Sequence, residues 1–163
     1  MVKRFLAGLV IVALAAGFAP APKPKPKQKT NEDRELEQLQ GEWSLDSYEI
    51  GGRKINLGGR VTTTVKVSKT QWTMEQGGGF GRPVAPVKYT IKLNASKTPR
   101  WIDLTPQKGQ TGVTMIGIYE IQGNTLKLSY VSSFQGGRAT RPTSFNDPNN
   151  NSLVMIYKRT GKK

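Results

Sequence analysis

About eight short segments of this chain alternate apolar with polar residues, which is the pattern of β-strands with one buried and one exposed face. Glycine, proline and asparagine residues mark turns between the segments, and no helix long enough for a parallel crossover separates them. We therefore expect each strand to pair antiparallel with the next along the chain. A meander of this length closes naturally on itself, which removes exposed edges. The sequence thus predicts an all-β fold, an up-and-down antiparallel barrel of about eight strands.

The expected strands differ in length but share a period of two residues. They cover residues 42–50, 60–68, 71–76, 84–93, 101–104, 114–121, 125–131 and 152–159. The second strand shows the pattern clearly, because Val65 and Val67 share one face while Thr64 and Lys66 share the other. A Gly-Asn turn at residues 123–124 predicts a hairpin between the sixth and seventh strands.

The first 17 residues have the features of an export signal. Lys3 and Arg4 supply positive charge at its start, and the apolar stretch at residues 5–16 is shorter than the roughly 20 residues that span a bilayer. We expect residues 1–17 to be a signal peptide and the protein to be exported, to a periplasm, a cell envelope or the medium. The alternative is an uncleaved anchor, which would be the one expected contact with a membrane.

Residues 18–30 form a linker in which proline alternates with lysine. Because proline fixes φ and the lysines repel one another, this linker is expected to be an extended spacer. Its alternative role is electrostatic attachment to an anionic envelope surface. The barrel domain is expected to occupy residues 31–163 and to begin with a short helix. Asn31 can cap this helix, and Leu36 and Leu39 share a face that would cover one end of the barrel.

Two residue types are absent from the sequence, cysteine and histidine. Zinc and copper sites usually need one or both of them, and histidine-based triads and general bases need the second. The absence of cysteine also excludes disulfides and a lipid-modified cysteine at the N-terminus. We expect no metal, no cofactor, no catalytic residues and no enzymatic activity.

The formal net charge is +14, but part of it belongs to the N-terminal segments. Six of the 25 Lys and Arg residues precede Asn31, which leaves 19 cations against 11 acidic residues, or about +8, on the barrel domain. Such a surface favours solubility and attracts anionic partners. An anionic envelope component is therefore one expected partner, whereas no nucleic acid is expected for an exported protein. The chain is expected to be a monomer.

Gly41 and Trp43 form a Gly-x-Trp pattern at the start of the first strand, and Arg159 ends the last strand. This combination resembles the lipocalin and calycin pattern. The resemblance implies that the tryptophan packs across the closed end of the barrel and that the arginine stacks over it.

Four longer blocks resemble a family of small exported planctomycete proteins that is described as lipocalin-like and has no known function. The blocks are LQGEW at residues 39–43, SKTPRWIDL at 96–104, GIYEIQGNTLKLSY at 117–130 and RPTSF at 141–145. The resemblance covers residues 36–159 and brings no established catalytic residues. Relatives often carry cysteine near the position of Ser129, so a redox or metal role built on that cysteine does not carry over.

Six large side chains are candidates for the barrel interior, and therefore for ligand binding. They are Trp72, Met74, Tyr89, Met115, Tyr119 and Tyr130. An eight-stranded barrel is just wide enough to be filled by its own side chains or to hold one small ligand. These residues are thus either core packing or the walls of a cavity, and methionine and aromatic walls suit an apolar or amphipathic ligand.

Asp103 interrupts an apolar segment, and it can face solvent or pair with Arg100 or Arg141. A structural ion pair is expected for Asp103. Arg141 is expected to anchor a long loop, with anion recognition by its guanidinium as the alternative, and the two residues together are a possible polar anchor. The glycines at residues 77–81 lack the spacing of a phosphate-binding loop. They are expected to form a hairpin loop at the barrel mouth, with a lid as the alternative.

Two functions follow from these expectations. The first is an exported lipocalin-like barrel that binds a small apolar or amphipathic ligand non-covalently. The second is an envelope interaction module, whose basic surface and Lys/Pro linker hold an anionic polymer or a partner protein. The first predicts a cavity in the barrel. The second predicts salt-sensitive binding that weakens when residues 23–29 are removed.

Overall fold

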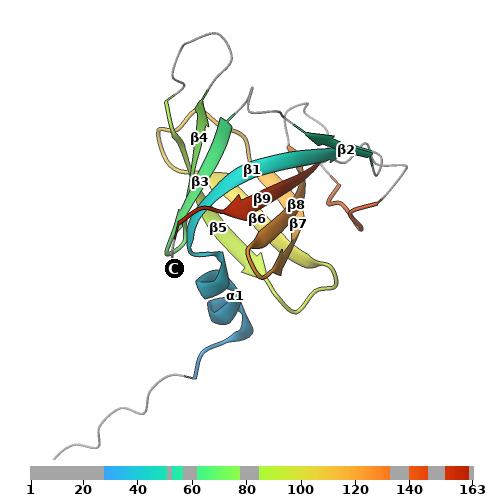
Figure 1. Ribbon diagram of the computed structural model, residues 1–163. Coiled ribbons are helices and arrows are strands. Elements are labelled where there is room, and N and C mark those ends of the chain that lie inside the picture. The colour runs from blue at the N-terminus through green and yellow to red at the C-terminus, as the bar shows by residue number, and fades with distance from the viewer. Residues whose placement is uncertain are drawn as a thin grey trace, which may run out of the picture.

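The computed structural model describes residues 28–50, 53–56, 62–77, 85–132, 140–146 and 153–161, which form one helix and nine strands (Figure 1). The elements are α1 (Asn31–Leu39), β1 (Gly41–Ile50), β2 (Arg53–Asn56), β3 (Thr62–Ser68), β4 (Gln71–Gly77), β5 (Val87–Asn94), β6 (Arg100–Pro106), β7 (Met115–Gln122), β8 (Thr125–Ser132) and β9 (Val154–Arg159). The expected signal peptide at residues 1–17, most of the linker at 18–30 and the glycines at 78–81 lie outside the described residues and stay predictions. Within the described ranges, no helix has the length and apolar character needed to cross a membrane.

Eight of the strands, β1 and β3 to β9, form a closed antiparallel barrel. From β3 onward each strand pairs with the next along the chain, and β1 pairs with both β3 and β9. The pairing of β1 with β9 joins the two ends of the sheet and sets Trp43 opposite Arg159. The structure thus confirms the predicted all-β, up-and-down, lipocalin-like barrel with a short N-terminal helix.

The ninth strand, β2, is an addition to the barrel. It pairs with residues 47–50 of β1, on the same edge that β3 occupies over residues 41–44. With four residues, β2 is too short to show a period of two in the sequence, so the pattern does not predict it. The β1–β2 hairpin lies on the side of the barrel away from α1 (Figure 1).

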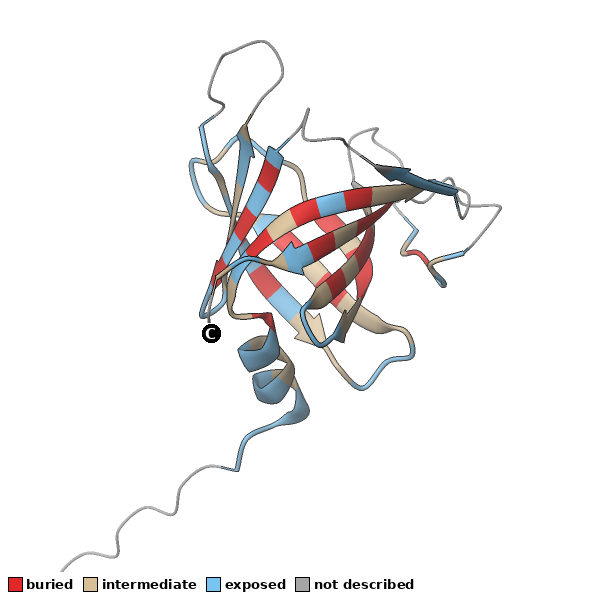
Figure 2. Ribbon diagram, in the orientation of Figure 1, coloured by how far each residue is buried: buried red, intermediate tan, exposed pale blue. Residues whose placement is uncertain are grey.

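Buried residues alternate with more exposed residues along the strands (Figure 2). In β3 the buried residues are Thr63, Val65 and Val67, as the period of two predicts. The buried residues of the interior cluster are Leu39, Trp43, Leu45, Val65, Val67, Trp72, Tyr89, Ile91, Ile102, Leu104, Met115, Tyr119, Leu126, Leu128, Met155 and Tyr157. Removing apolar surface from water contributes roughly 25 cal/mol per Å², so this cluster is the main source of stability.

Helix α1 covers one end of the barrel and is capped by Thr30. The Thr30 hydroxyl accepts a hydrogen bond from the Asp33 amide (3.1 Å), and the Asp33 carboxylate accepts one from the Thr30 amide (2.9 Å). The prediction of Asn31 as the cap is wrong, because Asp33 completes a capping box only with a residue three positions earlier. At the other end of the helix, the buried Leu39 accepts a 2.8 Å hydrogen bond at its carbonyl from Trp43 Nε1.

A second layer covers part of the outer surface of the barrel. Residues 140–146 lie against β6 and β7, where Arg141 Nη1 donates a 2.6 Å hydrogen bond to the Gly117 carbonyl. Ile118 and Val154 are almost fully buried, although neither belongs to the interior cluster. The barrel therefore has apolar packing outside as well as inside, which alternation along the strands does not reveal.

Candidate functional site

The six interior candidates all lie on the inner face of the barrel. Trp72, Tyr89, Met115 and Tyr119 are buried, and Met74 and Tyr130 are partly buried against the same cluster. The pairing of β4 with β5 sets Trp72 directly opposite Tyr89. Tyr119 lies toward the end covered by α1, because its hydroxyl is 3.4 Å from the Glu35 carboxylate.

All five tyrosines belong to the interior cluster or pack against it, and four of them lie near one another. These four are Tyr48 of β1, Tyr89 of β5, Tyr130 of β8 and Tyr157 of β9. Burial, helped by the nearby Tyr48 and Tyr89 side chains, raises the pKa of Tyr130 to about 12. Burial also raises the pKa of Tyr157, with smaller contributions from Tyr130 and Tyr48. The Tyr157 hydroxyl donates a 3.5 Å hydrogen bond to Met155 Sδ, and the Tyr130 hydroxyl is protonated at neutral pH, as any tyrosine is, and is a further possible donor.

Trp72 has an indole N–H without a hydrogen-bond partner. Its side chain is fully buried, and its ring stands at 88° to the Tyr157 ring with 6.3 Å between the centroids. Among the described residues nothing accepts a hydrogen bond from Trp72 Nε1. A buried donor left unpaired in this way costs about 1–3 kcal/mol. An acceptor brought beside Trp72 would recover this free energy.

The rest of the interior is apolar and adaptable. Met115 and Met155 are buried, and flexible methionine side chains accommodate ligands of irregular shape. Of the buried polar side chains that the structure describes, Thr63 faces the interior, whereas Ser47 and Ser129 lie on the outer face, opposite Ile156 and Val154; none of the three is an acid or a base. The interior is thus lined mainly by apolar side chains, with a few neutral hydrogen-bonding groups among them.

The end of the barrel opposite α1, which we call the mouth, lies beside the Tyr89 hydroxyl. Strand β5 begins there at Val87, and the connection from β6 to β7 passes close to Tyr89. A Cβ added to Gly112 in this connection would lie 3.1 Å from Tyr89 Oη and 3.4 Å from Val87. Glycine at this position therefore lets the backbone approach the tyrosine.

Sequence reasoning missed three interior residues, Tyr48, Met155 and Tyr157. Met155 and Tyr157 alternate in the last strand, so the period of two was a sufficient signal for both. Tyr48 gave no such signal, because a bulge between Leu45 and Ser47 shifts the alternation of β1. Leu45 lies opposite Tyr157 and Tyr48 lies opposite Met155, so both residues of β1 face inward despite their odd spacing.

Gly41, Trp43 and Arg159 meet at the closed end of the barrel, where the Arg159 side chain lies over the Trp43 ring. Arg159 also donates to the carbonyls of Gln38 and Gln40 at the end of α1. These residues join the helix to the barrel and leave the guanidinium no free face toward the interior. We assign them a structural role.

Asp103 and Arg141 lie on the outer surface, away from the interior candidates. Arg141 Nη2 is 2.6 Å from Asp103 Oδ1, and the guanidinium carbon is 4.6 Å from the centre of the Trp101 ring. Arg100, the other possible partner of Asp103, pairs instead with Glu35 of α1 at 2.9 Å. Because Arg141 is directed at Asp103 and at backbone carbonyls, it anchors residues 140–146.

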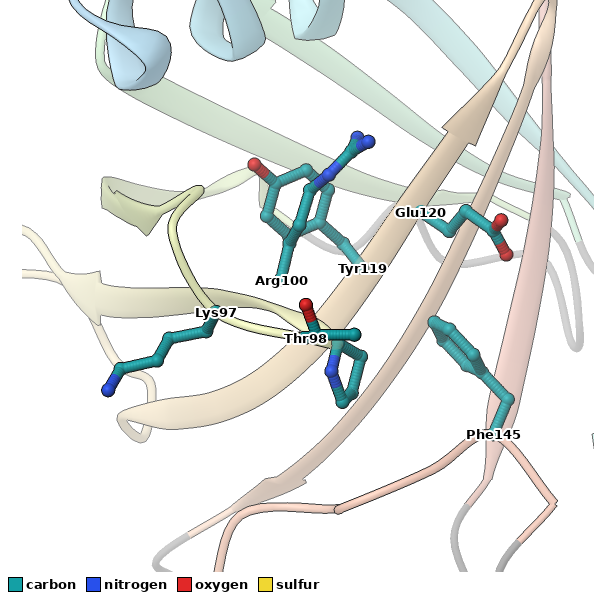
Figure 3. A pocket seen from close by; sticks show the side chains of 7 residues that line it. Lys97, Thr98, Arg100, Tyr119, Glu120 and Phe145 are labelled. Carbon is teal, nitrogen blue, oxygen red and sulfur yellow. The ribbon is translucent and has the colours of Figure 1, made fainter.

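A pocket of about 340 Å³ is lined by residues 97–100, Tyr119, Glu120 and Phe145 (Figure 3). Arg100 and Tyr119 extend toward α1, while Glu120 and Phe145 lie across the pocket from them (Figure 3). Glu35 accepts hydrogen bonds from both Arg100 (2.9 Å) and Tyr119 (3.4 Å). Since these polar groups already have partners, the interior with its unpaired Trp72 is the stronger candidate site.

Metal binding finds no support in the described residues. They contain no group of three or more His, Cys, Asp or Glu side chains that could hold an ion.

No family model matches the sequence, and no curated protein matches it either. Among solved structures, the chain is similar to one described as a REP1-NXSQ fatty acid transporter. The two share 15% sequence identity with a TM-score of 0.37, over 78% of this chain and 99% of the other. This similarity is too distant to assign a ligand, so a ligand class has to be argued from the interior side chains.

Proposed function

We propose that this protein is an exported, lipocalin-like barrel that binds one small, mostly apolar molecule inside the barrel without a covalent bond. The observation that carries the proposal is the fully buried Trp72 Nε1, which lacks a hydrogen-bond partner within the described residues. The ligand we infer has an acceptor, such as a carbonyl or ether oxygen, that takes this hydrogen bond. Membership in the family of small exported lipocalin-like proteins is part of the same proposal.

Two further features support an apolar ligand with a polar end. The Tyr130 hydroxyl is a neutral donor packed against the interior cluster, and the buried Met115 and Met155 side chains can move to fit an apolar body. Binding sites for small molecules commonly combine apolar walls with a few placed polar groups. The narrow interior of an eight-stranded barrel limits the ligand to one small molecule.

Native mass spectrometry of protein purified from its own cells without detergent tests the proposal. A defined small-molecule adduct that is lost on denaturation is the expected result, and the mass difference identifies the ligand. The emptied protein should also bind anilinonaphthalene sulfonate, and the natural ligand should displace this probe. Protein that carries no adduct and binds neither this probe nor a dansylated fatty acid would overturn the proposal.

Variants then locate the site. We expect Trp72→Phe to weaken binding of the dansylated probe about tenfold, which corresponds to one buried hydrogen bond. Tyr130→Phe should also weaken binding, whereas Tyr119→Phe should not, because the Tyr119 hydroxyl faces Glu35 at the closed end. Equal effects of the two tyrosine variants would place the probe outside the proposed site.

A second candidate function, the envelope interaction module, has one observation in its favour. Lys88 and Lys92 lie exposed on the outer face of β5, and neither forms an ion pair with another described residue. Salt-sensitive binding to isolated envelopes that is weakened in a Lys88→Gln/Lys92→Gln variant would support this function. Binding that does not depend on salt or on these lysines would count against it.

A further inference from the structure

Two large apolar side chains lie exposed on the described surface, and both belong to the β1–β2 hairpin. Ile50 is 47% exposed and Ile55 is 46% exposed. Every other large apolar residue in the described ranges is at least partly covered. Exposed apolar residues that cluster on one element mark an interaction surface more often than scattered ones do.

The pairing register places both isoleucines on the face that leads into the barrel. Tyr48 lies directly opposite Ile55, and Ile50 follows Tyr48 by two residues, so the three share one face of the hairpin. Tyr48 packs against the interior cluster and lies near Tyr130 and Tyr157. The exposed isoleucines therefore continue the apolar interior outward to the rim of the mouth.

Two cationic residues lie next to the isoleucines in the hairpin. Arg53 lies directly opposite Ile50 on the same face, whereas Lys54, the neighbour of Ile55, lies on the other face. Both are exposed, and among the described residues Lys54 pairs with the exposed Asp46 at 3.3 Å. Exposed pairs of this kind contribute little and do not keep a lysine from another anion. Apolar residues beside exposed Lys and Arg are the combination by which proteins attach to the surface of anionic membranes.

We propose that the β1–β2 hairpin docks on an anionic lipid bilayer, with Ile50 and Ile55 entering the headgroup region beside Arg53 and Lys54. The role of this docking rests on the proposed function. If the barrel binds an apolar ligand, a mouth held at the bilayer can exchange that ligand with the lipid directly. This contact is separate from the uncleaved N-terminal anchor, which is the alternative to a signal peptide. Two half-exposed isoleucines give weak attachment, as repeated loading and release require.

Charge decides between a lipid surface and a second copy of the chain. Two hairpins that met around a twofold axis would bring Arg53 and Lys54 of one copy toward those of the other, and like charges repel. The barrel domain carries about +8 in total, which also disfavours self-association and favours an anionic surface. The lipid headgroup therefore fits this surface better.

The absence of cysteine permits a direct test with a single label. Ile55→Cys carrying an environment-sensitive nitrobenzoxadiazole dye is mixed with vesicles of phosphatidylcholine and phosphatidylglycerol. We expect a blue shift and brighter emission that weaken as salt is added, and no change with phosphatidylcholine alone. The same dye at Lys92→Cys on β5 should not respond. A silent label at position 55, or an equal response at position 92, would overturn the proposal.

Paired charge variants test the same contact without a label. Arg53→Gln/Lys54→Gln and Lys88→Gln/Lys92→Gln each remove two exposed cations, but from different faces. We expect the hairpin variant to lose about tenfold or more in vesicle co-sedimentation, and the β5 variant to lose much less. Equal losses would indicate attraction by net charge alone and would contradict docking through the hairpin.

Two readouts separate this proposal from the one on which it rests. Vesicle binding is measured on ligand-free protein, and probe binding is measured without vesicles. Protein that binds vesicles but not the probe would contradict the proposed ligand binding and leave the docking proposal standing. Protein that binds the probe but not vesicles would contradict the docking proposal alone. Sedimentation velocity that shows a vesicle-independent dimer, abolished by Ile50→Ser/Ile55→Ser, would assign the hairpin to a second copy and overturn the lipid proposal.

Discussion

The guanidinium carbon of Arg159 lies 4.0 Å from the centre of the Trp43 ring, so the last strand of the barrel is stacked on the first. The same guanidinium donates to the Gln38 carbonyl at 2.6 Å and to the Gln40 carbonyl. One side chain thus joins β1, β9 and the end of α1. Desolvation at this site lowers the pKa of Arg159, but arginine remains charged at any physiological pH.

Replacing Arg159 should therefore loosen the closed end. Arg159→Lys keeps the charge but loses the planar fork that reaches both the ring and the two carbonyls, so we expect a loss of about 1–2 kcal/mol. Urea unfolding followed by tryptophan fluorescence measures the change. Lys158→Ala serves as the control, because that exposed lysine bonds only Thr125, and its effect should stay below about 0.5 kcal/mol. Equal effects would contradict a special role for the stacked arginine.

Glycine at position 41 allows the Arg159 side chain to lie close to the backbone of β1, and alanine at this position should not. Its φ is +111°, and an added Cβ would lie 2.9 Å from Arg159 Nη1. We expect Gly41→Ala to cost about 1–3 kcal/mol. Gly109→Ala separates the two causes, since Gly109 also has a positive φ (+82°) but has open space around its missing Cβ. A Gly41→Ala loss no larger than that of Gly109→Ala would mean that the clash with Arg159 is relieved by movement.

Replacing Ser129 with alanine should increase the stability of the barrel. Its side chain is fully buried, and its hydroxyl has no hydrogen-bond partner among the described residues. Ser129→Ala removes that unpaired group and should stabilise the barrel by about 1 kcal/mol. Ser47 is equally buried but donates to Asp46 at 3.2 Å, so Ser47→Ala should have the opposite sign. Thermal unfolding compares the two variants, and destabilisation by both would show that the Ser129 hydroxyl is paired in solution.

Stability should fall at high pH because buried tyrosines resist ionisation. Burial raises the pKa of Tyr130 to about 12 and also raises those of Tyr89, Tyr119 and Tyr157, whereas an unfolded tyrosine ionises near pH 10. A tyrosine whose pKa is raised by folding does not destabilise the folded state below about pH 10, where it is protonated in both states. Its contribution to the free energy of unfolding is lost as the pH rises toward 12.

We therefore expect tyrosinate absorbance to rise together with loss of near-ultraviolet circular dichroism. Ionisation of the tyrosines near pH 10 while the dichroism is unchanged would contradict their burial. Tyr119→Phe should leave most of the alkaline transition in place, because three of the four affected side chains remain.

Much of the barrel could be predicted because one rule, the period of two, holds along most of the long strands. Strand β3 follows this rule without exception, and its pattern gives both the element and its inward face. The rule fails where geometry is not repetitive. Tyr48 faces inward only because of a bulge, and the four residues of β2 are too few to show a period.

The contacts between distant residues lay beyond the sequence for a different reason. Asp103 had two candidate partners in the sequence. Only the structure shows that Asp103 forms an ion pair with Arg141 while Arg100 forms one with Glu35. The unpaired Trp72 Nε1 was equally hidden, since a tryptophan in a strand usually finds an acceptor and nothing local shows when it does not. Trp72 itself was predictable as an inward residue, but its open hydrogen bond was not.

The pairing of β1 with β9 also determines when this chain can become a barrel. One edge of β1 pairs with β9, which is the last strand to be synthesised. Until β9 is made, the sheet therefore has two unpaired edges that can pair with another chain. A chain shortened by one strand would have no smaller barrel to adopt, because β1 and β8 would both lose their partner. We expect such fragments to aggregate or to be degraded. Arg159 locks onto Trp43 only when β9 is in place, which makes that contact a marker of completed assembly.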